Sequence, residues 1–239
     1  VGLASIVLPQ MSADLQRRTL LEITKIATEV LNAAGAQLVG GHTTMGAELT
    51  IGFTVTGTKN SMPLTIAGAK HGDALILTRP IGSGVILAAD MLGQAEGHNV
   101  AATLAIMGQP QDREAVVLST VAHAMTDVTG FGLAGHVHAM CQASGLDAHL
   151  FQDAIPTYPG ARALSDAGVS STLMPENYTD APVNGLHDAL LYDPQTAGGL
   201  LASVPKIQSA AVIEALGALG CTGHVIGRLS KGTGRVCLS

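Results

Sequence analysis

Apolar residues recur along the chain at two spacings, and these spacings predict where helices and strands lie. Between Met11 and Gly35 they fall three and four residues apart, which predicts one long helix that Gly35 closes. Residues 49–58 alternate apolar and polar positions and are rich in β-branched side chains, which predicts a strand. The segment 59–72 then holds proline and several glycines, as is typical of a junction between two lobes.

After residue 72 the pattern mixes buried strands with helices, and the two do not strictly alternate. Strands are predicted at residues 73–78 and 199–204 and in the stretches GHVIGRL and GRVCLS near the end. Helices are predicted from the RPIGSG turn to about residue 92, twice within 99–123, from 130 to about 143, and at 206–219. Residues 156–190 are rich in turn formers and predict weak helices at best. This order favours an α+β fold over a doubly wound sheet.

The composition narrows the class of protein. With three Phe, three Tyr, no Trp and 29 Gly, the core must consist of small and aliphatic side chains. A formal charge of −6 without basic clusters argues against nucleic acid or an anionic membrane as partner. No apolar stretch approaches the roughly 18 residues of a membrane span. Cys141, Cys221 and Cys237 lie far apart, so we expect reduced thiols in a cytosolic protein.

The stretch AMTDVTGFGLAGH, residues 124–136, places Asp127 just ahead of three glycines that spell G-x-G-x-x-G. One interpretation is a dinucleotide site, but a carboxylate would repel the pyrophosphate, and VAHAMTDVT is a poor strand. A second is a tight turn in which Asp127 caps the following helix. A third is that Asp127 binds a divalent cation, which bridges the carboxylate to phosphates while the glycines admit backbone close to the ligand. The local residues leave all three interpretations open.

The stretch LVGGHT, residues 38–43, is predicted to be a short strand that runs into a glycine turn. The N–H groups of Gly40 and Gly41 could turn toward phosphate or a base edge, and His42 and Thr43 would add polar contacts. For an isolated G-G-H, an ordinary turn with a hydrogen-bonded histidine is the better interpretation.

The stretch LLYDPQTAGGLLASV, residues 190–204, indicates a structured turn beside a sheet edge. Asp193 and Pro194 begin the turn, and Gln195 and Thr196 can bond backbone groups. The remaining histidines do not have the sequence spacing of metal ligands. The sequence also contains no familiar nucleophile motif or phosphate-binding loop motif.

In this order and at these intervals, GGHT, TDVTGFGLAGH and DPQTAGGLLASV resemble the selenophosphate synthetase (selenide, water dikinase) family. The likeness runs over essentially the whole chain and includes GDALILTRPIGSGV. It implies the two-lobed α+β fold of aminoimidazole ribonucleotide synthetase. Residues 1–65 would be the C-terminal part of the N-terminal ATP-binding and dimerisation lobe, and residues 66–239 the complete C-terminal α+β lobe.

The resemblance also implies an activity and a site. Members make selenophosphate, AMP and phosphate from ATP, selenide and water, with ATP as substrate and Mg²⁺ as cofactor. The full-length parent would be a cytoplasmic homodimer that binds neither nucleic acid nor membrane. By this likeness Asp127 is a Mg²⁺ ligand, and Gly40, Gly41 and His42 contact ATP from across the dimer.

The family's glycine-rich segment with its reactive Cys or selenocysteine and nearby Lys has no counterpart in this sequence. We therefore expect a fragment that lacks roughly 100 residues ahead of Val1 and is inactive alone. We assign no catalytic residue, because none of the three cysteines has the required context, and Lys70 is interpreted as a solvated turn residue. Two alternative functions remain: another ATP-using enzyme of the superfamily, such as aminoimidazole ribonucleotide synthetase, or a non-catalytic module that binds a partner.

Overall fold

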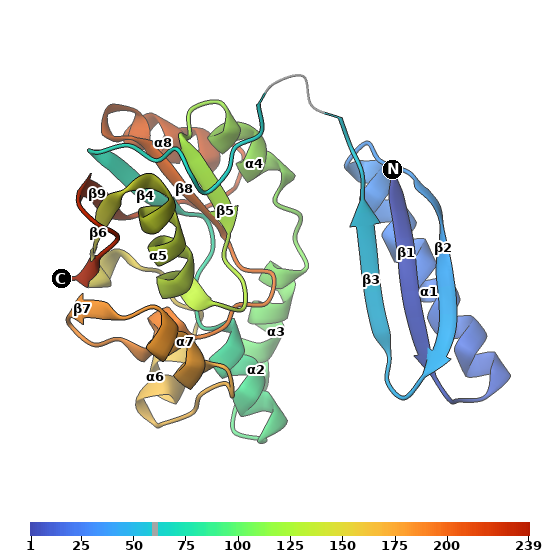
Figure 1. Cartoon of the computed structure of the whole chain (residues 1–239). Helices are drawn as coiled ribbons and strands as arrows, with labels where there is room; N and C mark the ends of the chain where they lie inside the picture. Colours follow the sequence, from blue (N-terminus) through green and yellow to red (C-terminus); the bar gives the residue numbers. More distant parts are fainter. Residues whose placement is uncertain (59–61) are drawn as a thin grey trace. The chain divides into compact units, whose positions relative to one another are not determined.

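The computed structural model describes residues 1–58 and 62–239 and divides into two compact units, Val1–Pro63 and Leu64–Ser239 (Figure 1). The division falls two residues before the boundary expected at 65 and 66. The start of the expected junction, residues 59–61, lies outside the described residues. The assignment of the smaller unit to ATP binding and dimerisation stays a prediction.

The smaller unit is a three-stranded sheet with one helix packed on it (Figure 1). Strand β1 (Gly2–Pro9) lies in the middle, parallel to β2 (Leu38–Gly46) and antiparallel to β3 (Thr50–Val55). Helix α1 (Ala13–Ala33) begins where the Ser12 hydroxyl accepts a bond from the Leu15 N–H at 3.4 Å. The predicted helix and strand are therefore present, whereas β1 was missed.

Side chains of β1 alternate between the two faces of this sheet, and one face supplies the core of the smaller unit. Ala4, Ile6 and Leu8 are buried, with Leu20 and Ile23 of α1 packed against them. The long helix is thus held on the sheet by the apolar spacing that predicted it.

The larger unit is built on a seven-stranded mixed sheet with the order β5-β8-β4-β9-β6-β10-β7. Neighbours from β5 to β6 are antiparallel, whereas β10 runs parallel to both β6 and β7. The strands are β4 (Asp73–Leu77), β5 (Ala124–Asp127), β6 (Leu146–Leu150), β7 (Val183–Gly185), β8 (Leu200–Pro205), β9 (His224–Lys231) and β10 (Val236–Leu238).

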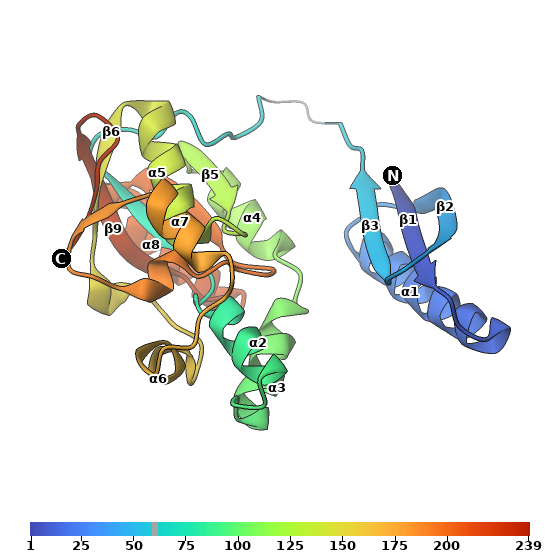
Figure 2. The ribbon, with the colours of Figure 1, turned by 60° about the horizontal axis from the view of Figure 1, so that its bottom comes forward.

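Helices cover both faces of this sheet, and each face has its own apolar cluster (Figure 2). Leu75 and Leu77 of β4 pack with residues of α2 and α5, whereas Ala74 and Ile76 pack with residues of α4 and α8. The helices are α2 (Ser83–Met91), α3 (Gly97–Met107), α4 (Asp112–Ser119), α5 (Gly132–Ser144), α6 (Ala161–Asp166), α7 (Met174–Asp180) and α8 (Ser209–Ala218), with short 3₁₀ turns at Gln152–Ala154, Ala189–Tyr192 and Lys206–Gln208.

Most of the predicted elements of the larger unit are found within a few residues of their expected bounds, but β5, β6 and β7 were missed. Cys141 is buried and Cys221 and Cys237 are half-buried, and all three are free thiols. Across residues 1–58 and 62–239, no helix has the length and apolar character needed to cross a membrane.

Candidate functional site

The turn after β5 carries Asp127 and is packed against the stretch that contains DPQTAGG. The Val128 N–H donates to the Gly199 carbonyl at 2.8 Å, and the Gln195 N–H donates to the Thr129 carbonyl at 3.0 Å. A Cβ on Gly198 would overlap the carbonyl oxygen of Val128. The structure therefore brings together two of the three stretches that stand out in the sequence, 124–136 and 190–204. The absence of a side chain at Gly198 permits their close approach.

The DPQT residues also hold the start of α2. The Gln195 Oε1 accepts bonds from the Gly82 N–H, the Ser83 N–H and the Ser83 hydroxyl at 3.0, 3.2 and 3.1 Å. The carboxylate of Asp193 accepts a bond from the Gly84 N–H at 3.0 Å. These acceptors satisfy N–H groups that a helix leaves unpaired at its N-terminus. The turn predicted from sequence thus has a defined structural role.

Asp193 is fully buried, and its burial raises the pKa of the carboxyl from the ordinary 3.8 to about 6. Bonds from the Gln195 side chain and from backbone N–H groups at the start of α2 oppose this shift. Its Oδ1 has no hydrogen-bond partner among the described residues, and a Cβ on Gly84 would come within 2.5 Å of that atom. Asp193 is therefore a tightly enclosed structural carboxyl.

A buried arginine fixes the segment between Gln195 and Gly199. The guanidinium of Arg79 donates to the carbonyls of Ala197, at 2.8 Å, and Gln109. Ala197 itself has a positive φ of 50°, which is unusual for a residue with a side chain. A Cβ on Gly199 would lie 2.5 Å from the Arg79 backbone nitrogen. The loop that supports the Asp127 turn is thus constrained from both sides.

Asp127 is the last residue of β5 and is exposed. It does not cap α5, because that helix begins at Gly132 and no side chain among the described residues caps its N-terminus. The helix-cap interpretation is therefore wrong. The dinucleotide interpretation is also wrong, because β5 is antiparallel to its neighbour β8, whereas that site needs a parallel βαβ unit. The divalent-cation interpretation stays a prediction.

The glycines after Asp127 serve different purposes. A Cβ on Gly130 would meet no described atom within 4 Å, so the backbone there is open on the side of the described residues. Gly132 has a φ of 69°, and a Cβ there would lie 2.7 Å from the Leu191 carbonyl oxygen, so its role is conformational. The Asn177 amide holds the turn by donating to the carbonyls of Gly130 and Tyr192 at 2.8 and 2.9 Å.

His136 is a site residue that the sequence analysis did not assign. Its Nε2 accepts a bond from the Thr129 N–H at 3.0 Å, so the ring proton resides on Nδ1. Burial lowers the pKa of His136, whereas the negative charge of Asp127 raises it by a smaller amount. A neutral imidazole therefore supports the turn from the first part of α5. The only sequence signal was its place seven residues after Thr129.

Gly40, Gly41 and His42 lie within β2 of the smaller unit, so the expectation of a glycine turn was wrong. Gly41 pairs with Ala4 of β1, and a Cβ on Gly41 would overlap the Ala4 carbonyl oxygen. His42 pairs with Ser5, so it lies on the face away from the buried Ala4. These three residues are neighbours on one exposed strand, whereas Asp127 belongs to the other unit.

One carboxylate at an open turn fits one kind of metal site. Within residues 1–58 and 62–239, no group of three or more His, Cys, Asp or Glu side chains could enclose a metal ion. Mg²⁺ in nucleotide sites needs only one or two carboxylates, because substrate phosphates and waters supply the other oxygens. Asp127 therefore fits a shared Mg²⁺ ligand and does not fit an all-protein metal site.

The family model described as "AIR synthase related protein, C-terminal domain" matches residues 70–237, nearly all of the larger unit. The chain belongs to this family. It is also similar to the selenide, water dikinase of Bdellovibrio bacteriovorus, with 34% identity over 91% of this chain and 65% of the relative. Selenide, water dikinase 2 of Peptoclostridium acidaminophilum is 32% identical, and the match covers 88% of this chain and 64% of that relative. The chain thus spans less than two thirds of the length of these relatives.

Solved structures show the same fold at lower identity. Thiamine-monophosphate kinase from Stenotrophomonas maltophilia K279a matches with a TM-score of 0.72 and 19% identity. The match covers 99% of this chain and 71% of the kinase chain. The hydrogenase maturation protein HypE from E. coli matches with a TM-score of 0.71 and 19% identity. The match covers 99% of this chain and 69% of the HypE chain. The expected α+β, AIR-synthetase-like fold is confirmed.

Proposed function

We propose that this chain forms part of the ATP site of an enzyme that makes selenophosphate from ATP, selenide and water, releasing AMP and phosphate. Relatives named selenide, water dikinase, similar over most of the chain, support this reaction. The observation that carries the proposal is the exposed Asp127 carboxylate beside an open glycine turn that two other segments hold in place.

The proposed roles follow from the local geometry. Asp127 offers one carboxylate oxygen to Mg²⁺, which when bound would neutralise charge between this carboxylate and the phosphates of ATP. In the described part of the chain, no acceptor bonds the N–H of Gly130, which leaves this donor available to a phosphate oxygen. The bonds from Val128 to Gly199 and from Gln195 to Thr129 keep the turn rigid before ATP arrives.

Gly40, Gly41 and His42 are proposed to contact ATP bound to the other copy in a cytoplasmic homodimer. Their place on an exposed edge strand suits this role, because β2 pairs with only one neighbour, β1, in the described sheet. The His42 ring then supplies a donor, and Gly40, where a Cβ would meet only the Leu3 side chain at 3.7 Å, allows a ligand to approach the strand closely.

A chimera tests the function without assuming where the natural protein begins. In the full-length selenide, water dikinase of B. bacteriovorus, the matched 228 residues are replaced by their counterparts from this chain. With ATP, selenide and Mg²⁺, the chimera is expected to form selenophosphate, detected by ³¹P NMR, with equal amounts of AMP and phosphate.

The Asp127→Asn chimera should lose this activity, whereas Asp153→Asn, a change at an exposed carboxylate outside the turn, should keep it. A folded chimera that consumes ATP without forming a selenium product would contradict the proposed reaction. Full activity in Asp127→Asn would contradict the proposed site.

A further inference from the structure

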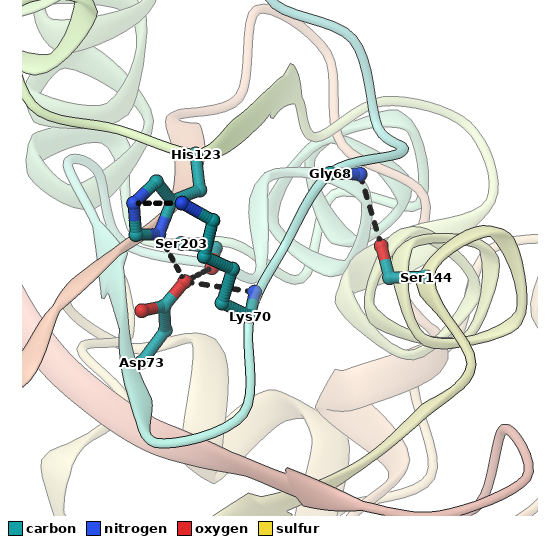
Figure 3. Close-up of polar contacts among 6 residues, drawn as sticks. All are labelled: Gly68, Lys70, Asp73, His123, Ser144 and Ser203. Carbon is teal, nitrogen blue, oxygen red and sulfur yellow. Dashed lines mark hydrogen bonds and ion pairs between the residues drawn. The ribbon is translucent and has the colours of Figure 1, made fainter.

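A second polar cluster in the larger unit, formed by Lys70, Asp73, His123 and Ser203, has no part in the proposed ATP site (Figure 3). Asp73 begins β4 and is only 3% exposed. Its Oδ2 accepts bonds from the Lys70 N–H at 2.9 Å, the His123 Nδ1 at 2.8 Å and the Ser203 hydroxyl at 2.6 Å. One carboxylate oxygen therefore orients the other three residues.

This arrangement fixes the protonation of the histidine ring. Because an ionised carboxylate can only accept hydrogen bonds, His123 must carry a proton on Nδ1 to bond Asp73. In the neutral ring, Nε2 then has a lone pair, and it lies 3.1 Å from the Nζ of Lys70. The structure thus places a proton acceptor against a lysine, in the order found in carboxylate–histidine–nucleophile triads.

The chain just ahead of Lys70 is held in place at two points. The Met125 N–H donates to the Thr65 carbonyl at 3.0 Å. The Gly68 N–H donates to the Ser144 hydroxyl at 3.3 Å (Figure 3). Gly68 has a φ of 120°, and a Cβ there would lie 2.9 Å from the His123 carbonyl oxygen. Lys70 itself is exposed, so an electrophile in solution can reach its amine.

We propose that Lys70 is a reactive amine that accepts an acyl group from an activated acyl donor, either an acyl phosphate or an acyl thioester. The Lys70 ammonium passes one proton to Nε2 of His123, and the amine lone pair attacks the acyl carbon. A C–N bond forms as the C–O or C–S bond breaks, and the electron pair leaves with the phosphate or the thiolate. The nitrogen then loses its second proton to water, which leaves a neutral amide on Lys70.

The roles of the other residues follow from their contacts. Asp73 and Ser203 are positioning residues, because they fix the ring through Nδ1 and do not reach the reacting nitrogen. The proposal is independent of the ATP site, since neither Asp127 nor Gly130 belongs to the cluster. Acylation would remove the positive charge of Lys70.

The test measures acetylation rates in the 239-residue chain by peptide mass spectrometry. Acetyl phosphate and acetyl coenzyme A are used in separate reactions, with the exposed Lys206 and Lys231 as internal references. Lys70 should be acetylated about tenfold faster than either reference with at least one donor, because a positioned base typically contributes a factor of that size or more. If Lys70 is acetylated at the same rate as the reference lysines with both donors, the proposal is wrong. This outcome does not depend on the results with the variants.

Variants separate proton acceptance from simple exposure. His123→Gln should lower the Lys70 rate to that of the references, whereas His71→Gln, a change at an exposed neighbour, should leave it unchanged. Asp73→Ala should also lower the Lys70 rate, because it removes the oxygen that accepts from Nδ1 and lets the ring proton move to Nε2. The ¹⁵N NMR signals of His123 report this change of tautomer. A folded His123→Gln protein in which Lys70 reacts at the original rate would contradict the role of His123.

Discussion

Replacing Asp193 by Asn should change how the stability of the larger unit depends on pH. The folded protein raises the pKa of this carboxyl from 3.8 to about 6, chiefly by burial. Below about pH 3 the group is protonated in both the folded and the unfolded chain. Between about pH 4 and pH 6 the folded chain keeps the proton that the unfolded chain has lost, so the free energy of unfolding falls as the pH rises.

The size of this effect follows from the two pKa values. A shift of one pKa unit corresponds to about 1.4 kcal/mol, so ionising buried Asp193 costs the folded state about 3 kcal/mol by pH 7. Asn is close in shape to Asp, and its carbonyl oxygen can still accept from the Gly84 N–H. The new side chain cannot ionise, so the Asp193→Asn protein lacks this one contribution to the pH dependence.

The assay is urea unfolding of the original chain and of Asp193→Asn at pH 4, 5, 6 and 7. The difference between the two free energies of unfolding should shift by about 2.4 kcal/mol in favour of the variant as the pH rises from 4 to 7. All other ionisable groups are the same in both proteins, so their contributions cancel. A difference that stays constant over this range would refute the assignment of Asp193 as a buried carboxyl with a raised pKa.

Two glycine substitutions test the support and the opening of the Asp127 turn separately. Gly198→Ala should lower the free energy of unfolding by about 1–3 kcal/mol, because its Cβ would overlap the Val128 carbonyl. Gly217→Ala in α8 is the control and should not lower the free energy of unfolding, because its Cβ would meet no described atom within 4 Å. Urea unfolding measures both variants. Gly130→Ala should leave the melting temperature unchanged but weaken ATP binding, measured by isothermal titration calorimetry, and unchanged affinity would mean that phosphates do not approach this backbone.

Local pattern predicted those elements whose structure depends on their own residues. The run DALILT predicted β4 because all of its strand residues are buried between two helical layers. Strand β5 was missed because its four residues, Ala124–Asp127, show no alternation of their own. They form a strand through pairing with β8 and through the bond from Met125 to the Thr65 carbonyl, which lies far earlier in the chain.

The candidate site was predictable in its parts and not in its connections. The glycines after Asp127 indicated a turn, which the structure contains, whereas the role of Asp127 at a ligand stays a prediction. The glycines at 40 and 41 wrongly indicated a second turn, because pairing with β1 extends that segment as a strand. The contact between Asp73 and His123 joins residues 50 positions apart and depends on how the sheet is assembled. Neither residue has a neighbour in the sequence that would have indicated the pair.

Binding of ATP to the 239-residue chain, with and without Mg²⁺, tests the central claim most directly. By isothermal titration calorimetry, ATP should bind more tightly when Mg²⁺ is present, and Asp127→Asn should remove this metal-dependent gain, with a loss of about tenfold or more in affinity. The melting temperature without ligand should not change, because the Asp127 side chain is exposed and caps no helix. Asp153→Asn serves as the control and should bind like the original chain. If Asp127→Asn instead kept the full Mg²⁺-dependent affinity, the proposed role of Asp127 at the phosphates would be wrong.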